Sequence, residues 1–254
     1  MSALPAAHAL PTTDALVIVA KYPEPGAVKT RLAAHIGAQA ATRLYSAFLG
    51  DLAQRFGAAQ ARDGYALRWA CAPGRHPPEA LRAFVGADGD IFPQRGDDFA
   101  DRLYAIACDT CAAGYRRLVI ISSDSPHLPA GVVADAFAAL DDADVVLGPA
   151  EDGGYYLIGL PLYALDEGAD APPDLFRGIR MSTETVCAET FTRAHDLGLT
   201  VELLAPTFDI DEAPDLARLW TALGHAHERL APRTRLALAG LLPRIPPSAL
   251  LPTH

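Results

Sequence analysis

A short basic segment near the start of the chain carries the residue types that bind phosphate groups. Residues 21–31 (KYPEPGAVKTR) hold Lys21, Lys29 and Arg31 against one acid, a local charge of +2 in a chain of net charge −10. Lysine meets phosphate oxygens as a point charge and arginine meets them as a planar fork. Gly26 completes a Pro-x-Pro-Gly turn that confines the backbone. A solvated loop could have the same composition, but its place directly after an apolar run favours phosphate binding.

An aspartate follows a later apolar run and suits a divalent cation. Asp124 comes shortly after residues 118–121 (LVII), and Pro126 prevents the strand from continuing. Magnesium takes one or two carboxylates and completes its shell with phosphate oxygens and water. The alternative is a helix N-cap, but the prolines place the next helix several residues later. The spacing therefore favours a metal ligand that also takes part in catalysis.

Two further aspartates follow the run at 201–204. Asp209 and Asp211 are two residues apart, so in an extended segment their side chains point to opposite faces. We expect one of them to face the metal and the other to cap the helix that begins at Pro214.

A glycine-rich segment combines acids with backbone that a ligand can approach closely. Residues 148–156 (GPAEDGGYY) place Glu151 and Asp152 side by side, where they could orient an acceptor or act as a base. The candidate substrate contacts of this segment are Gly153, Gly154 and Tyr155. A plain β-turn at Asp-Gly would look similar.

Two hydroxyl residues open a helix that the pattern predicts over residues 182–197. Ser182 and Thr183 serve there as N-cap residues, with anion or acceptor binding as the less favoured interpretation.

Short apolar runs alternate along the chain with amphipathic helical stretches. Runs of this kind predict strands buried on both faces, and the alternation predicts a mostly parallel α/β sheet with helices on both faces. The expected strands are 16–20, 65–71, 91–92, 118–121, 145–147, 155–160 and 201–204, and the expected helices include 37–56, 78–85, 97–113, 132–140, 182–197 and 214–223. Ligands of such sheets bind beyond the carboxyl ends of the strands, where segments 21–31, 122–126, 148–156 and 208–212 lie. We expect one domain over 14–242 with flexible tails at 1–13 and 243–254.

Composition limits the class of protein. The chain has 254 residues, of which 50% are hydrophobic and 20% charged, so a packed core is expected. The acidic balance argues against nucleic acid and membrane surfaces as partners. No apolar run approaches a membrane span, and four cysteines without a disulfide pattern indicate a cytoplasmic protein.

Taken together, these segments resemble a bacterial glycosyltransferase-like family that was long catalogued as a domain of unknown function and is associated with arsenosugar biosynthesis. The matching segments are 20–26 with 28–32, 123–126, 148–159, 181–183 and 209–211, within about residues 15–219. The resemblance implies the GT-A nucleotide-diphospho-sugar transferase fold, a Rossmann-like sheet that uses a divalent metal. The family is also similar to 2-phospho-L-lactate guanylyltransferase, whose opening loop has the same lysine, arginine and leucine arrangement.

These likenesses assign roles to residues. Lys21, Lys29 and Arg31 would hold phosphates, while Asp124 with Asp209 or Asp211 would hold Mg²⁺ or Mn²⁺. The leading hypothesis is a metal-dependent glycosyltransferase that uses a nucleotide sugar and a small-molecule acceptor. The alternative is a nucleotidylyltransferase that joins a nucleoside triphosphate to a small phosphorylated acid. A non-catalytic nucleotide-binding protein is the third, less favoured, hypothesis.

Overall fold

One seven-stranded sheet is the centre of the computed structural model, which describes residues 12–87, 89–162, 171–227 and 229–250. The strands are β1 (Asp14–Ala20), β2 (Tyr65–Cys71), β3 (Asp90–Pro93), β4 (Arg117–Ser122), β5 (Val145–Pro149), β6 (Tyr155–Pro161) and β7 (Val201–Leu203). They lie in the order β3-β2-β1-β4-β6-β5-β7. The predicted α/β class with a mostly parallel, Rossmann-like sheet is confirmed.

One strand runs against the others. β6 is antiparallel to both β4 and β5, whereas β1, β2, β3 and β4 pair in parallel and β5 pairs in parallel with β7. The short connection between β5 and β6 makes this pair a hairpin. The glycine-rich segment is therefore the hairpin turn at the carboxyl end of β5 as well as a candidate site.

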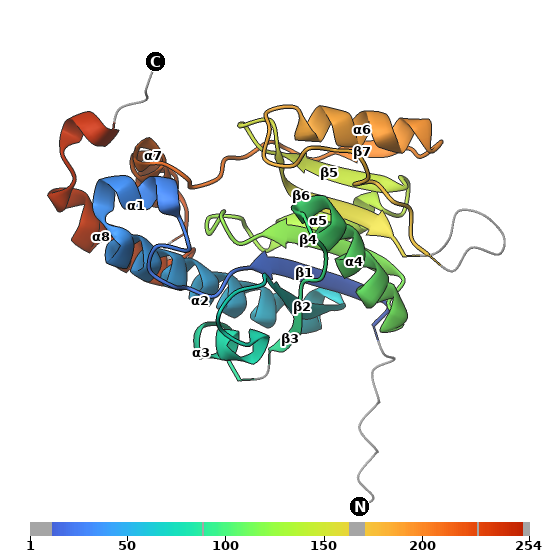
Figure 1. Cartoon of the computed structure of the whole chain (residues 1–254), viewed down its shortest axis with the longest axis horizontal. Helices are drawn as coiled ribbons and strands as arrows, with labels where there is room; N and C mark the ends of the chain where they lie inside the picture. Colours follow the sequence, from blue (N-terminus) through green and yellow to red (C-terminus); the bar gives the residue numbers. More distant parts are fainter. Residues whose placement is uncertain (1–11, 88, 163–170, 228, 251–254) are drawn as a thin grey trace, which may run out of the picture.

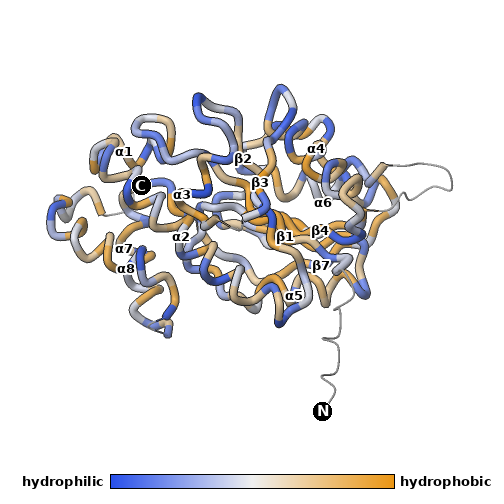
Figure 2. The backbone as a smooth tube through the Cα atoms, turned by 90° about the horizontal axis from the view of Figure 1, so that it is seen from below, coloured by the Kyte–Doolittle hydropathy of each residue, from blue (hydrophilic) through white to orange (hydrophobic). Residues whose placement is uncertain are grey.

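Helices cover both faces of the sheet (Figure 1). They are α1 (Thr30–Ile36), α2 (Ala38–Asp63), α3 (Arg82–Val85), α4 (Phe99–Ala112), α5 (Gly131–Ala139), α6 (Val186–Asp196), α7 (Ala213–His225) and α8 (Pro232–Leu241), with 3-10 turns η1 (Pro78–Leu81), η2 (Leu242–Arg244) and η3 (Pro247–Leu250). Residues of α2, α5 and α7 pack with one face of the strands, and residues of α4 and α6 pack with the other. The apolar strands thus lie at the centre, between more hydrophilic outer segments (Figure 2).

Three features differ from the sequence-based expectations. Helices α1 and α8 were not predicted, because each buries few side chains and lacks a long apolar stripe. The predicted helix 182–197 begins only at Val186, since Ser182 has a positive φ of 65° and cannot belong to a right-handed helix. Residues 243–250, expected to be a flexible tail, instead form η2 and η3, and Ile245 is buried. Proline at the first position of such turns is well tolerated.

The remaining parts of the expected tails, 1–11 and 251–254, lie outside the described residues. The single-domain boundaries of 14–242 remain a prediction. Among the helices in the described ranges, none is both long and apolar enough to cross a membrane.

Candidate active site

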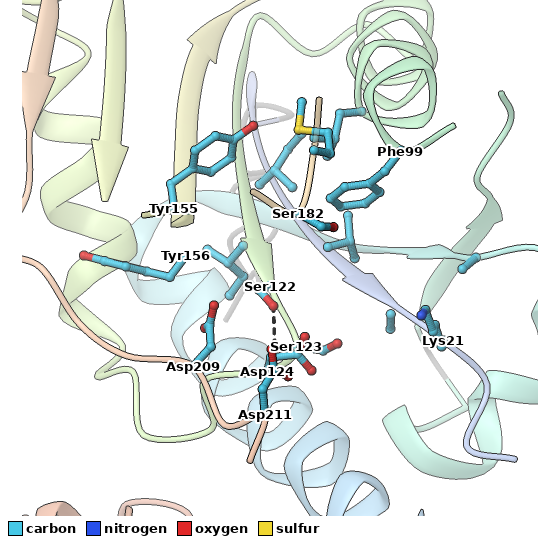
Figure 3. Close-up of a pocket in the computed structure, with 18 of the residues that line it drawn as sticks. Lys21, Phe99, Ser122, Ser123, Asp124, Tyr155, Tyr156, Ser182, Asp209 and Asp211 are labelled. Carbon is cyan, nitrogen blue, oxygen red and sulfur yellow. Dashed lines mark hydrogen bonds between the residues drawn. The ribbon is translucent and has the colours of Figure 1, made fainter. Parts of the chain in front are cut away.

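A cavity of about 580 Å³ opens at the carboxyl ends of β1 and β4, where the sequence pattern places the site. It brings together most of the predicted residues. They are Lys21, Lys29, Arg31, Asp124, Asp152, Gly154, Tyr155, Ser182, Thr183, Asp209 and Asp211. In Figure 3 the carboxylates of Asp124, Asp209 and Asp211 gather beneath the end of β4, and Lys21 lies on the far side of β1 from them.

Three predicted residues do not line this cavity. Glu151 forms an ion pair with Arg218, whose hydrogen bond lowers the pKa of the Glu151 carboxyl. Gly26 lies in the turn closed by the hydrogen bond from Ala27 N to Glu24 O. Gly153 packs against the backbone of Glu184 instead of facing the cavity. These three residues therefore lie outside the cavity lining.

Lys29 links the basic loop to the acidic side of the cavity. Its Nζ lies 2.5 Å from Asp124 Oδ1 and 3.0 Å from Asp211 Oδ1. Burial by itself would lower the pKa of Lys29, but the two carboxylates raise it above the usual lysine range. Lys29 holds this position with a left-handed backbone conformation (φ 48°) at the start of α1, which is costly for a residue other than glycine. The strained conformation turns a permanently charged ammonium group toward the carboxylates.

Asp209 and Asp211 have different environments. The hydroxyl of Ser125 donates a hydrogen bond to Asp209, and the Asp211 carboxylate contacts Lys29. Burial raises the pKa of Asp209 to about 7, and the negative charge of Asp124 adds to this rise. Neither aspartate caps α7, contrary to expectation. A capping box of Glu212 and Asp215 does so, because their side chains accept hydrogen bonds from the free backbone amides of the first turn.

Several lining residues were not predicted from the sequence. They include Tyr45, Gln94, Phe99, Arg102, Ser122, Ser123, Tyr156 and Met181. The buried hydroxyl of Tyr45 accepts a hydrogen bond from Lys21 N (3.0 Å) and is 2.9 Å from Ser123 Oγ, so it joins the basic loop to the end of β4. Burial raises its pKa to about 12, which keeps it protonated. Tyr45 sits within an ordinary helical apolar stripe, and no local pattern distinguishes it from a core residue.

The donor atoms of the site suit a hard divalent cation. Asp124 and Asp209 present carboxylate oxygens to the cavity, as Mg²⁺ and Mn²⁺ prefer. In the part of the chain that the structure describes, no group of three or more His, Cys, Asp or Glu side chains is arranged to enclose an ion. Two carboxylates completed by substrate phosphate oxygens and water are nevertheless a usual magnesium shell. The residues present fit such an ion.

His127 gives the stability of the fold a defined pH dependence. Its Nε2 is 3.0 Å from Thr207 Oγ1 and its ring stacks on Phe208 at 4.3 Å. Burial lowers its pKa to about 4, and the nearby Arg55 and Arg218 contribute. Unfolded histidine titrates near 6.5, so between pH 6.5 and 4 the unfolded chain binds a proton that the folded chain does not.

We therefore expect His127 to lower the free energy of unfolding as the pH drops through this range, whereas Asp209, whose pKa is raised to about 7, contributes the opposite sign over an overlapping range. The extra slope that His127 contributes should approach about 1.4 kcal/mol per pH unit, the value for one proton. In urea unfolding at a series of pH values, the slope of the free energy of unfolding against pH should be larger by this amount in the wild type and in the exposed-histidine control His35→Gln than in His127→Gln. An equal slope in all three proteins would show that His127 titrates normally in the fold.

Comparisons with known proteins agree with this geometry. A family model described as "Uncharacterized protein conserved in bacteria (DUF2064)" matches residues 52–183. A crystal structure from Desulfovibrio desulfuricans G20, provisionally described as a nucleotide-diphospho-sugar transferase, is 31% identical with a TM-score of 0.79. The match covers 90% of this chain and 95% of that one.

A more distant structure shares the fold alone. It is a cytidylyltransferase from Leptospira borgpetersenii serovar Hardjo-bovis (strain JB197), 11% identical with a TM-score of 0.54, and the match covers 96% of this chain and 99% of that one. No protein of curated function matches the chain.

Proposed function

The chain belongs to the DUF2064 family of bacterial proteins, and we propose that it is a metal-dependent glycosyltransferase that takes a sugar from a nucleotide-diphospho-sugar and passes it to a small-molecule acceptor. The observation that supports this function is the meeting of the cationic loop 21–31 with the carboxylates Asp124 and Asp209 in one cavity. Departure of a nucleoside diphosphate requires positive charge at its phosphates. The 31% identity to the provisional nucleotide-diphospho-sugar transferase supports the same donor class.

The lining residues divide into three roles under this proposal. Lys21 and Arg31 bind the diphosphate, since both line the cavity from the basic loop. Lys29 holds Asp124 and Asp211 in place and contributes its charge to the leaving group. Asp152 reaches the cavity from the turn between β5 and β6 and orients the acceptor hydroxyl or accepts its proton. The remaining predicted substrate contacts that line the cavity are Gly154, Tyr155, Ser182 and Thr183.

We assign the metal to Asp124 with Asp209 as the second ligand, because Lys29 contacts both Asp124 and Asp211, whereas no ion pair engages Asp209 among the described residues; a metal at Asp124 would displace part of its contact with Lys29. A bound Mg²⁺ or Mn²⁺ would neutralise negative charge that develops on the diphosphate. Ser125 donates its hydroxyl hydrogen to Asp209 and so fixes the direction of that carboxylate.

Nucleotidylyl transfer is the second candidate, and the three cations of the basic loop favour it, because a departing pyrophosphate carries more charge than a diphosphate ester. The likeness to 2-phospho-L-lactate guanylyltransferase and the association with arsenosugars stay predictions from the sequence.

One incubation separates the candidates. The full chain is mixed with a set of nucleotide sugars, a set of nucleoside triphosphates, Mn²⁺ and a small-molecule cell extract. We expect release of nucleoside diphosphate from a sugar donor, dependent on both extract and metal. Pyrophosphate release without use of any sugar donor would replace this function by nucleotidylyl transfer. Ligand-induced thermal stabilisation without either product would indicate a non-catalytic nucleotide-binding protein.

The basic loop should discriminate phosphates from nucleosides. We expect Arg31→Ala to weaken binding of nucleoside di- and triphosphates at least tenfold, because a charge-assisted hydrogen bond contributes about 1.5–3 kcal/mol. Binding of the bare nucleoside should change less than twofold. Calorimetric titration of both ligands measures the difference, and Arg43→Ala, an exposed arginine on α2, is the matched control. An equal loss for nucleoside and nucleotide would contradict a phosphate contact.

A further inference from the structure

One cation of the cavity does not belong to the basic loop. Of the lining residues with a positive charge, Lys21, Lys29 and Arg31 belong to the basic segment 21–31, which runs from the end of β1 into α1, whereas Arg102 comes from the first turns of α4. The sequence pattern did not single out Arg102, because an arginine at this place in an amphipathic helix usually faces solvent. The tertiary structure instead directs it to the cavity.

Arg102 lacks a charged partner. Among the described residues its guanidinium forms no ion pair, and its Nε is buried without any hydrogen-bond partner. The polar contact that it makes with the described part of the chain, from Nη1 to Asp97 O, is 3.5 Å long and therefore weak. A buried donor without a partner is unfavourable by about 1–3 kcal/mol. This arrangement points to a ligand.

The walls around Arg102 strengthen its attraction for an anion. Its guanidinium carbon lies 5.7 Å from the centre of the Phe99 ring, and Leu103 and Met181 also line this part of the cavity. Charges attract more strongly beside apolar walls than in open water. Ser182, whose positive φ turns it toward the cavity, offers a hydroxyl.

This part of the cavity is separate from the carboxylates. Figure 3 shows Phe99 and Ser182 on the opposite side of Ser122 from Asp211. A ligand that uses the basic loop and the carboxylates for its phosphates therefore leaves Arg102 free for a second molecule. A planar guanidinium pairs with a carboxylate or a phosphate through two parallel hydrogen bonds.

We propose that Arg102 binds an anionic group, a carboxylate or a phosphate, of the acceptor, so that the acceptor is a small acidic molecule. The identification of the ligand as an acceptor rests on the proposed function. The anion site itself does not depend on any transfer reaction. Arg102 is thus a specificity-determining residue, and it sorts acceptors by charge.

The test measures anion binding at Arg102 directly. The Nε–H resonance of Arg102 in the full chain labelled with ¹⁵N-arginine is assigned by its absence in Arg102→Lys. Inorganic phosphate and acetate are titrated separately, each with and without a saturating mixture of nucleoside diphosphates and Mg²⁺. We expect at least one anion to shift this resonance with saturation, also when nucleotide fills the basic loop. Whether phosphate, acetate or both shift the resonance then shows whether the acidic group of the acceptor is a phosphate, a carboxylate or either.

Variants supply the second measurement. The affinity for the anion that shifts the resonance, measured by calorimetry with nucleotide present, should fall at least tenfold in Arg102→Gln. It should fall less in Arg102→Lys, which keeps the charge but lacks the planar guanidinium that donates two parallel hydrogen bonds. Arg43→Gln, on the exposed face of α2, should be unchanged. Nucleoside diphosphate affinity should stay within twofold in all variants.

Three results would overturn the proposal. The first is no shift of the Arg102 resonance with either anion up to about 100 mM, a concentration that covers even very weak binding. The second is an unchanged anion affinity in both Arg102 variants, and the third is a loss of nucleotide affinity equal to the loss of anion affinity, which would place Arg102 in the donor site. Failure of transferase activity with normal anion binding at Arg102 would instead count against the proposed function alone.

Discussion

Asp124→Asn should lower the rate of the transfer reaction by a factor of about 10²–10³, the usual effect of removing one group that stabilises charge in a transition state. The substitution removes the carboxylate 2.5 Å from Lys29 and one of the two proposed metal ligands. Metal-dependent nucleotide binding should be lost together with the activity. The measurements are product release under saturating donor and calorimetric nucleotide binding with and without Mn²⁺.

The fold should survive this change. The Asp124 side chain is 37% exposed, and Lys29 keeps its contact with Asp211. Asp141→Asn is the matched control, since Asp141 is an ion-paired aspartate whose partner Arg117 begins β4 at the far end from the cavity. Wild-type metal dependence in Asp124→Asn, or an equal loss of activity in Asp141→Asn, would contradict the assignment of Asp124 to the site.

Gly153→Ala should destabilise the chain by about 4 kcal/mol or more, which ranks among the largest effects of single substitutions. A Cβ at this position would lie 1.9 Å from the carbonyl oxygen of Glu184, a backbone atom that cannot move aside freely. Gly153 also has a φ of 89°, which disfavours any side chain. In addition, Cys187 N donates a hydrogen bond to Gly153 O, so a shift of the turn would break the junction with α6.

Urea unfolding of Gly153→Ala and Gly178→Ala separates the clash from the backbone strain. Gly178 has a similar φ of 80°, but a Cβ added there would meet nothing within 4 Å, so its replacement should be unfavourable by only about 1–2 kcal/mol. Equal losses of unfolding free energy in the two variants would show that backbone strain alone explains the need for glycine at position 153.

Local sequence patterns were sufficient to predict most of the helices and strands. Buried parallel strands must be apolar along their whole length, so runs such as 118–121 and 145–147 identified β4 and β5 without knowledge of their neighbours. The antiparallel direction of β6 was beyond such reasoning. An apolar strand has the same composition in either direction, and the turn at 150–154 was compatible with both a hairpin and a binding loop.

The sequence predicted which residues would meet in one cavity at the candidate site, but it did not predict how their side chains pair. Loops after strands gather at one edge of a parallel sheet, so Lys21, Asp124 and Asp209 could be expected together. The pairing of Lys29 with Asp211 joins residues 182 positions apart in the chain. It depends on side-chain directions that only the packed backbone sets, such as the left-handed conformation of Lys29.

Glu151 and Asp152 also show that the sequence does not determine the direction of a side chain. Glu151 and Asp152 are neighbours with equal chemistry in the sequence, but the turn between β5 and β6 sends Asp152 into the cavity and Glu151 outward to Arg218. Arg102 is the converse case, a residue of ordinary helical pattern that packing brings to the cavity wall. Sequence spacing locates an edge of the sheet, whereas the direction of each side chain at that edge depends on contacts between distant segments.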